Sequence, residues 1–199
     1  MKSIFSIALI CVCFHINAQT SLDALYKKYT ALDQYKLDIT YTFENAAMGF
    51  SNTQKGQLVV QGDRYRLNYG DTELWVSDGK TEYIGTKEED HSQILYFCAG
   101  QNEEAVLDFT QFLTFYEEDH RLVGNQGNTL ELESTGETIY VKAFIETNAT
   151  EISQIKLVDD MNSTYTFKIS GFTTKTSGTS FTINENDYRE KIDERRGCN

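Results

Sequence analysis

The chain has 199 residues, of which 40% are apolar and 24% charged, a composition that is typical of a folded protein and excludes wholesale disorder. It contains no proline, which excludes a proline-rich linker and a polyproline ligand. Its formal charge of −12 opposes contact with the phosphates of nucleic acids and with anionic headgroups, so no nucleic-acid partner is expected.

Residues 1–18 have the pattern of a cleaved secretory signal peptide. Lys2 supplies the positive start, residues 4–16 are almost all apolar, and Ala18 is a small residue at the expected cut. The apolar run is shorter than the roughly 20 residues of a membrane-spanning helix. We therefore expect export and a soluble mature domain over residues 19–199.

Lipidation of a cysteine within this leader is the alternative interpretation. Ile10 precedes Cys11 and Val12 precedes Cys13, whereas a lipidated cysteine usually follows a small residue. Cleavage after Ala18 therefore fits the sequence better.

Cys98 and Cys198 are the cysteines that remain after cleavage. In an oxidising compartment they could pair, and closing a loop of about 100 residues would stabilise the fold by roughly 4–5 kcal/mol. Alternatively, Cys198 lies on a frayed tail and has no partner. Its position next to the last residue favours the unpaired alternative.

Helical spacing occurs at two places. Ser21 can cap a first helix in which Leu22, Leu25, Tyr29 and Leu32 recur at intervals of three and four residues. Asn102 can cap a second helix over Glu103–Phe115, because Glu103 and Glu104 favour a helix start. The apolar stripe of this second helix contains Val106, Phe109, Phe112, Leu113 and Tyr116.

Most of the remaining chain alternates with period two. Tyr35, Leu37, Ile39, Tyr41 and Phe43 point one way while the polar residues between them point the other, as in an antiparallel strand with one apolar face. The same alternation occurs in Tyr65–Tyr69, Leu130–Leu132 and Tyr165–Ile169. Turn signals separate such runs at Gly62-Asp63, Gly70-Asp71, Asp78-Gly79, Gly127-Asn128 and Asp159-Asp160. The pattern predicts about ten or eleven strands in one mainly β domain with two helices.

The apolar face of such a sheet must be covered, either in a sandwich or in a barrel or half-barrel around a filled or hollow interior. Tyrosine and phenylalanine, 12 of each, dominate the inward positions. These aromatic residues could form a dense core or line a groove that is wide enough for acyl chains.

The order of these elements resembles the outer-membrane lipoprotein carrier family, LolA and its relatives, and in particular its Bacteroidetes-type members. The resemblance extends from Leu22 to about Tyr188. The segments that carry it are Gly56–Val60, Tyr65–Leu67, Glu73–Thr81, Glu103–Phe115, Tyr165–Phe172 and Phe181–Ile183.

The resemblance implies an incomplete antiparallel β-barrel, a half-barrel, closed by a helical lid. It also implies a non-enzymatic periplasmic carrier that takes lipoproteins or other acylated cargo from an inner-membrane lipoprotein-releasing transporter to an outer-membrane acceptor. A lipid-sensing regulator on the same fold, or an exported β-sandwich interaction protein without lipid cargo, are the alternatives. We expect a monomer.

The cavity of such a carrier would be lined by inward apolar positions of the strands and by the lid. These positions are Leu37, Ile39, Tyr41, Leu58, Val60, Tyr65, Leu67, Leu74, Val76, Phe109, Phe112, Leu113, Leu157 and Phe167. Some family members have a cargo-transfer arginine in the turn that here is Gly62-Asp63. Arg64 and Arg66 lie just downstream and are candidates for a place at the rim.

No constellation of residues indicates a catalytic, metal or cofactor site. His91 and His120 each end an acidic stretch, which is typical of solvated loops rather than of converging metal ligands. Signatures of nucleophilic hydrolases, P-loops and dinucleotide-binding turns are absent from the sequence.

Overall fold

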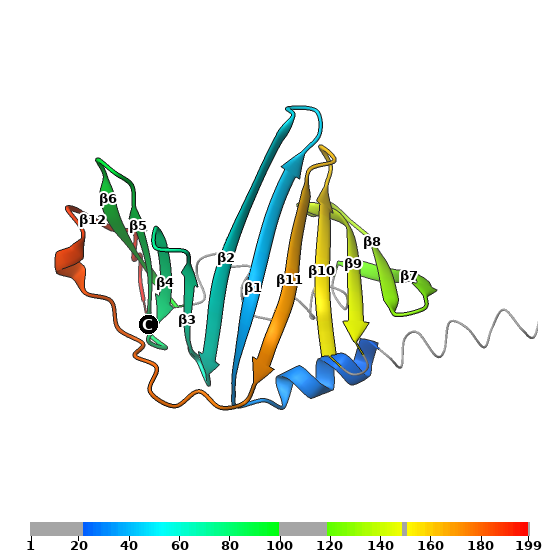
Figure 1. Cartoon of the computed structure of the whole chain (residues 1–199), viewed down its shortest axis with the longest axis horizontal. Coiled ribbons are helices and arrows are strands. Elements are labelled where there is room, and N and C mark those ends of the chain that lie inside the picture. The colour runs from blue at the N-terminus through cyan, green and yellow to red at the C-terminus, as the bar shows by residue number, and fades with distance from the viewer. Residues whose placement is uncertain (1–21, 100–118, 149–150, 199) are drawn as a thin grey trace, which may run out of the picture. The chain divides into compact units, whose positions relative to one another are not determined.

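The computed structural model describes residues 22–99, 119–148 and 151–198. The described chain contains a helix at residues 22–30, twelve strands and a short 3₁₀ helix, η1 (Glu185–Asp187). The strands, labelled in Figure 1, are β1 (Gln34–Asn45), β2 (Phe50–Gln61), β3 (Arg64–Tyr69), β4 (Glu73–Ser77), β5 (Thr81–Lys87), β6 (Ser92–Cys98), β7 (His120–Gln126), β8 (Thr129–Ser134), β9 (Tyr140–Asn148), β10 (Glu151–Asp159), β11 (Thr164–Thr173) and β12 (Glu190–Asp193).

The hydrogen-bonded neighbours follow the order β12-β6-β5-β4-β3-β2-β1-β11-β10-β9-β8-β7. This linear order is that of an open sheet, and it is consistent with the predicted incomplete barrel. The second predicted helix, and with it the lid, lies outside the described residues. One pairing differs from the antiparallel prediction, because β12 runs parallel to β6.

The chain forms two compact units. Of the described residues, unit 1 comprises residues 22–31, 42–52, 119–148 and 151–168, and unit 2 comprises residues 32–41, 53–99 and 169–198. The expected single domain over residues 19–199 stays a prediction.

In unit 1, the predicted first helix is confirmed at residues 22–30, where Leu22, Leu25 and Tyr29 are buried. It ends before Leu32, the last residue of the predicted apolar stripe. The Tyr29 hydroxyl accepts a hydrogen bond of 2.9 Å from the backbone N–H of Ile152. The helix therefore packs beside the start of β10 (Figure 1). The proposed cap, Ser21, lies outside the described residues.

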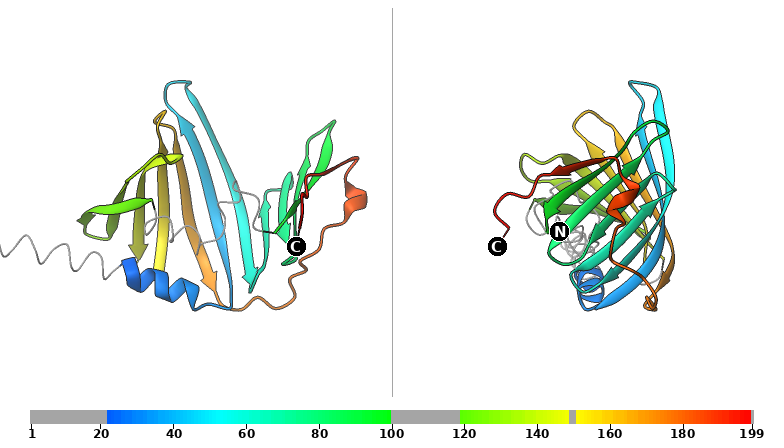
Figure 2. Two further views of the ribbon diagram at one scale, coloured as in Figure 1. Left: turned by 180° about the vertical axis from the view of Figure 1, so that it is seen from behind. Right: turned by 90° about the vertical axis from the view of Figure 1, so that its left-hand side faces the viewer.

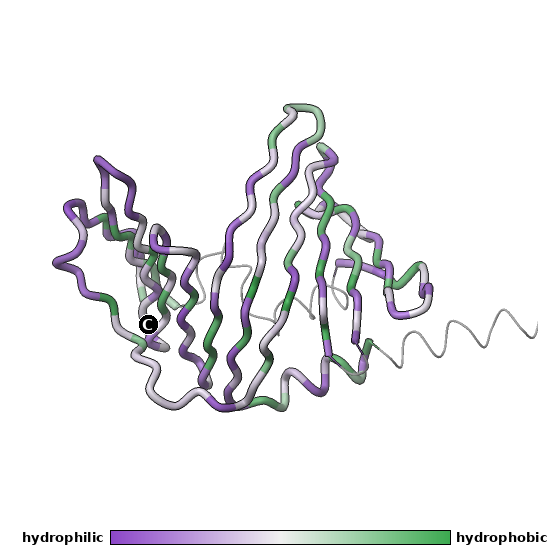
Figure 3. Tube along the Cα trace, in the orientation of Figure 1, coloured by the Kyte–Doolittle hydropathy of each residue, from purple (hydrophilic) through white to green (hydrophobic). Residues whose placement is uncertain are grey.

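The predicted alternation of buried and less buried residues is confirmed on β8 in unit 1 and in the first half of β1 in unit 2 (Figure 3), whereas Tyr165–Ile169 on β11 contains no buried residue. In unit 1, Leu130 and Leu132 are buried on β8. In unit 2, Tyr35, Leu37 and Ile39 are buried on β1. Turns or bends lie at all five predicted positions.

The prediction for His120 as part of a solvated acidic loop is wrong. This residue begins β7 and is only 8% exposed, and its Nε2 lies 2.8 Å from the backbone oxygen of Tyr140. The acidic run before it misled the interpretation, because an acidic turn can lead directly into a buried strand position. His91, in contrast, is exposed.

The prediction that Cys198 is unpaired is also wrong. In unit 2, Cys98 at the end of β6 forms a disulfide with Cys198, and the two Cα atoms are 5.5 Å apart. The chain end is held in place because β12 pairs with β6 a few residues earlier. Figure 2 shows β12, in dark red, alongside β6, in green.

Candidate functional site

In unit 2, one side of the sheet carries apolar side chains on five consecutive strands, β2 to β6. We call this side the first face of unit 2. The register places one side chain from each strand in a single row. The row consists of Leu58, Leu67, Trp75, Ile84 and Leu95. Leu58 and Leu67 are 0% exposed, whereas the other three are half-buried. Because all five project to the same side of the sheet, they form one continuous apolar strip.

Strand β1 extends this first face with the predicted residues Leu37, Ile39 and Tyr41. The ring of Tyr41 lies 6.0 Å from that of Tyr69 on β3, centroid to centroid. Tyr69 faces Gly56 across the β2–β3 pair, and a Cβ at this glycine would lie 2.8 Å from its ring. Glycine thus provides the space in which the Tyr69 ring lies.

Tyr69 is buried, at 7% exposed. Burial raises the pKa of its phenol above the ordinary value, and the neighbouring Tyr41 and Glu73 raise it further. The hydroxyl is therefore neutral at physiological pH. Glu73, which pairs with Tyr69 across β3 and β4, is the charged residue beside this ring.

Unit 1 has a second apolar surface, which we call the apolar face of unit 1. The register of β8 to β11 aligns two rows of four side chains each. The rows are Leu130–Ile145–Ile155–Phe167 and Leu132–Ala143–Leu157–Tyr165. The members on β8, β9 and β10 are buried, but Phe167 and Tyr165 on β11 are half-buried. Apolar surface therefore stays accessible at the β11 side of this face.

Aromatic rings continue from Tyr165 within unit 1. Phe43 on β1 lies 5.1 Å from Tyr165 and 5.9 Å from Phe50 on β2, centroid to centroid. Tyr140 on β9 meets Tyr165 edge to face at 5.4 Å. These distances are those of favourable aromatic pairs.

The opposite side of the unit 2 sheet, its second face, is covered by the C-terminal segment. We call residues 176–198 the strap. Phe181 packs into a cluster with Val59 and Val76, and Tyr188 packs with Ile94 and Tyr96. The partly buried side chains around these clusters are Leu74, Tyr83 and Ile183.

The two predicted rim arginines hold this strap. Arg66 Nη1 donates to the backbone oxygens of Ser180 and Thr182, at 3.3 and 3.1 Å. The guanidinium of Arg64 lies 4.8 Å from the ring centroid of Phe181, which is a cation–π distance. The expected part of these arginines in cargo transfer stays a prediction, whereas their contacts with the strap are structural.

We expect Arg66→Ala to lower the free energy of unfolding by about 1–2 kcal/mol, because two charge-assisted hydrogen bonds to the strap are lost. Arg66→Lys should restore only part of this, because an ammonium group lacks the planar geometry of the guanidinium. Urea unfolding of the two variants measures both effects. If both variants were as stable as the parent protein, these contacts would not hold the strap.

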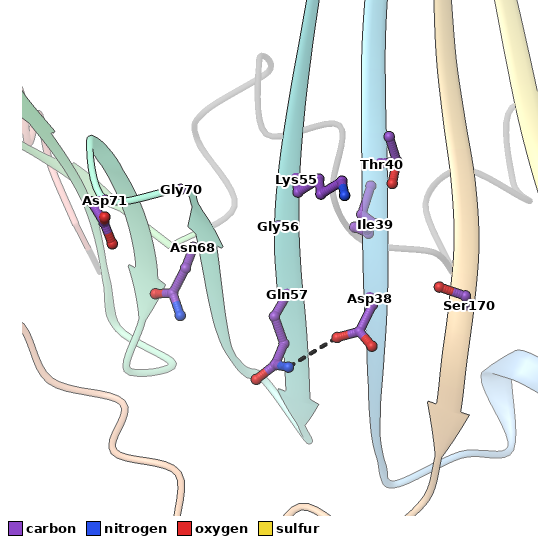
Figure 4. Close-up of a pocket in the computed structure, with 10 residues that line it drawn as sticks. All are labelled: Asp38, Ile39, Thr40, Lys55, Gly56, Gln57, Asn68, Gly70, Asp71 and Ser170. Carbon is purple, nitrogen blue, oxygen red and sulfur yellow. Dashed lines mark hydrogen bonds between the residues drawn. The ribbon is translucent and has the colours of Figure 1, made fainter.

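A polar pocket of about 550 Å³ lies on β1, β2, β3 and β11 within unit 2, as Figure 4 shows. Gln57 Nε2 donates to Asp38 Oδ1 at 2.9 Å across its floor. Lys55, Asn68 and Ser170 add further polar groups. This lining does not suit an acyl chain.

The structure therefore distributes the predicted cavity residues over three surfaces. The first face of unit 2 carries Leu37, Ile39, Tyr41, Leu58, Val60, Tyr65 and Leu67. The apolar face of unit 1 carries Leu157 and Phe167. Leu74 and Val76 lie under the strap on the second face of unit 2. Phe109, Phe112 and Leu113 lie outside the described residues.

Sequence reasoning missed Trp75, Ile84 and Leu95 on the first face, and Ile145 and Ile155 in unit 1. In the run Leu74-Trp75-Val76 every residue is apolar, so the sequence does not tell which side each one faces. For Ile155, a β-bulge between Ile152 and Gln154 breaks the alternation.

Neither a metal centre nor a membrane-spanning helix is found among the described residues. They contain no group of three or more His, Cys, Asp or Glu side chains that could hold a metal ion. None of their helices has the length and hydropathy that are needed to cross a bilayer.

Comparison with known proteins gives matches only at the level of structure. The sequence matches no protein-family model and no curated protein. A LolA superfamily protein from Nitrosomonas europaea is similar at 11% identity, with 83% of this chain and 97% of that chain covered and a TM-score of 0.49.

Two mycobacterial structures are similar as well. LprF from Mycobacterium bovis has 11% identity, 85% and 98% coverage, and a TM-score of 0.44. The lipoprotein LppX from Mycobacterium tuberculosis has 10% identity, 82% and 99% coverage, and a TM-score of 0.38. The protein from Nitrosomonas europaea is described as a member of the LolA superfamily, which is the family that the sequence resembles. The narrower Bacteroidetes type stays a prediction.

Proposed function

We propose that this protein is a non-enzymatic carrier that binds the acyl chains of lipoproteins, or of other acylated molecules, on its apolar sheet faces. One observation carries the proposal: each unit has a continuous cross-strand apolar face with half-buried side chains still accessible. Such a face suits a flexible hydrocarbon chain and provides no group for covalent chemistry.

The free energy of burying an acyl chain is large enough for a carrier. Burying one methylene group contributes about 0.8 kcal/mol, so a dozen methylenes contribute about 10 kcal/mol before the costs of ordering. An acyl chain could therefore be held firmly without a charged or covalent anchor. Half-buried rings such as Tyr165 and Phe167 would need little rearrangement to admit one.

The setting is part of the same proposal. The protein would be exported with residues 1–18 removed and would act in the periplasm as one domain over residues 19–199. It would receive cargo from an inner-membrane lipoprotein-releasing transporter and deliver it to an outer-membrane acceptor. The sequence resemblance to the LolA family supports this setting.

A pair of neighbouring residues on β11 offers a direct test. Phe167 belongs to the apolar face of unit 1, and Thr166 points to the other side of the same strand. Phe167→Asn should weaken the binding of a fluorescent fatty acid by roughly tenfold or more, because a ring contact with the chain is lost. Thr166→Asn is the matched control and should leave the affinity unchanged.

Two observations on the parent protein complete the test. Organic extraction of purified protein, followed by mass spectrometry, should detect co-purified acyl chains. If neither extraction nor the fluorescent probe reveals binding, the carrier proposal fails. Depletion in the native cell separates a carrier from a sensor, because only loss of a carrier leaves lipoproteins in the inner membrane.

A further inference from the structure

The most exposed large apolar side chains of the described residues gather at one edge of unit 1. Met48, Ile139, Met161 and Phe50 are 78%, 73%, 70% and 51% exposed. Met48, Ile139 and Met161 lie in the β1–β2, β8–β9 and β10–β11 connections, and Phe50 is the first residue of β2. In Figure 3 the β1–β2 turn is green at the upper end of its hairpin.

Strand register shows that these connections lie at the same edge. Asp159, at the end of β10, pairs with Tyr140, at the start of β9. Asn45, at the end of β1, donates from Nδ2 to Ser163 Oγ at 3.0 Å, just before β11 begins. The four apolar side chains therefore form a line along one set of strand ends.

Polar contacts fix the two turns that carry Met48 and Met161. Asn45 and Ser163 are 7% and 1% exposed, and Asn45 Oδ1 also accepts the backbone N–H of Met48 at 2.9 Å. Asn162 adopts a left-handed conformation (φ 59°) directly after Met161. Buried polar anchors thus hold exposed methionines outward, where they are not collapsed onto the sheet.

The charges beside this edge are suited to a neutral, zwitterionic surface. Glu137 and Asp160 lie in the connections, and no basic residue lies between residues 46 and 49, 135 and 139, or 160 and 163. An anionic bilayer would be repelled by these carboxylates. The ammonium groups of phosphatidylethanolamine would be attracted by them.

A pocket of about 340 Å³ lies behind Phe50 on the same edge. Its lining includes one cation, Lys156, and one carboxylate, Glu44. A zwitterionic headgroup presents a phosphate and an ammonium group, which match this pair of charges. The pocket therefore complements the headgroup while the apolar side chains reach below it.

We propose that this edge of unit 1 docks on a neutral phospholipid bilayer rich in phosphatidylethanolamine. Met48, Phe50, Ile139 and Met161 enter the acyl boundary, and Glu44 and Lys156 receive a headgroup. A row of separate side chains from three turns fits a planar interface better than a compact protein groove. Docking of this kind is reversible and goes beyond the binding of cargo.

The test is sedimentation of the mature protein, residues 19–199, with vesicles made of equal amounts of phosphatidylethanolamine and phosphatidylcholine. The parent protein should bind them, and binding should fall when phosphatidylglycerol replaces phosphatidylcholine. Met48→Ser combined with Met161→Ser should weaken binding by about a hundredfold, because two apolar side chains are lost from the interface. Asn125→Ser with Gln126→Ser, in exposed positions at the opposite strand ends, is the matched control and should change nothing.

Lys156→Gln should weaken vesicle binding several-fold if the pocket receives a headgroup. All of these variants should keep the affinity for the fluorescent fatty acid, so failure of docking is distinguishable from failure of acyl-chain binding. The proposal is overturned if the parent protein does not bind neutral vesicles, if it prefers anionic ones, or if the methionine variant binds equally well. Absence of vesicle binding would indicate a protein partner for this edge.

Discussion

Cys198→Ser should lower the free energy of unfolding by about 3–5 kcal/mol, which is a large effect for a single substitution. The disulfide joins residues separated by 100 positions, so its removal greatly increases the conformational entropy of the unfolded chain. Urea unfolding of the oxidised parent protein and of the variant measures the difference.

Reduction provides the control for this prediction. The parent protein in a thiol reductant should unfold at the same urea concentration as Cys198→Ser, and the variant itself should not respond to reductant. A thiol titration of the denatured mature protein, residues 19–199, should find no free thiol until reductant is added. If Cys98 and Cys198 titrate without reductant, the prediction is contradicted.

Gly85→Ala should lower the free energy of unfolding by about 2–4 kcal/mol, because the new methyl group collides with the strap. A Cβ at Gly85 would lie 2.1 Å from the hydroxyl oxygen of Tyr188 and 2.4 Å from its Cζ. The strand cannot move away, because Gly85 is paired with Leu74 on one side and Ile94 on the other. The Tyr188 ring must therefore leave its place against Ile94.

A double-mutant cycle tests this explanation. Tyr188→Leu alone should be destabilising, since the ring is 6% exposed and packs with Ile94 and Tyr96. Added to Tyr188→Leu, however, Gly85→Ala should cost much less than in the parent protein. Thermal or urea unfolding of the four proteins gives the coupling. Equal costs in both backgrounds would exclude the collision.

Much of the sheet could be predicted from the sequence, because antiparallel strands with one apolar face leave a clear period of two. The alternation in Tyr35–Ile39 and in Leu130–Leu132 corresponds to buried positions. Turns followed the glycine and aspartate signals, since Gly62, Gly70, Gly79 and Gly127 adopt positive φ angles that other residues avoid.

The strap could not be predicted, for a physical reason. Its anchors, Phe181 and Tyr188, are separated by a mostly polar segment that shows neither helical nor strand periodicity. Each ring packs against strand residues that are distant from it in the sequence. β12 has only four residues. The hydrophobic periodicity of a segment does not show which distant strands it packs against. The prediction for Cys198 was wrong for the same reason.

The distribution of the predicted cavity residues over three surfaces could not be predicted for a similar reason. A continuous apolar run such as Leu74-Trp75-Val76 supplies side chains to both faces of the sheet. Only the register, in which Trp75 pairs with Leu67 and Val76 with Arg66, shows which face each one joins. Sequence reasoning therefore identified the apolar strands but could not assign every side chain to a surface.

The parallel pairing of β12 with β6 also bears on the behaviour of the protein at high concentration. An unpaired outer strand exposes a row of N–H and C=O groups that can recruit a strand from another molecule. Glu190–Asp193 occupies this row on β6, and three of its four residues are charged. The short terminal strand thus protects the edge of β6 from pairing with a strand of another molecule. The disulfide at Cys198 keeps this strand from dissociating.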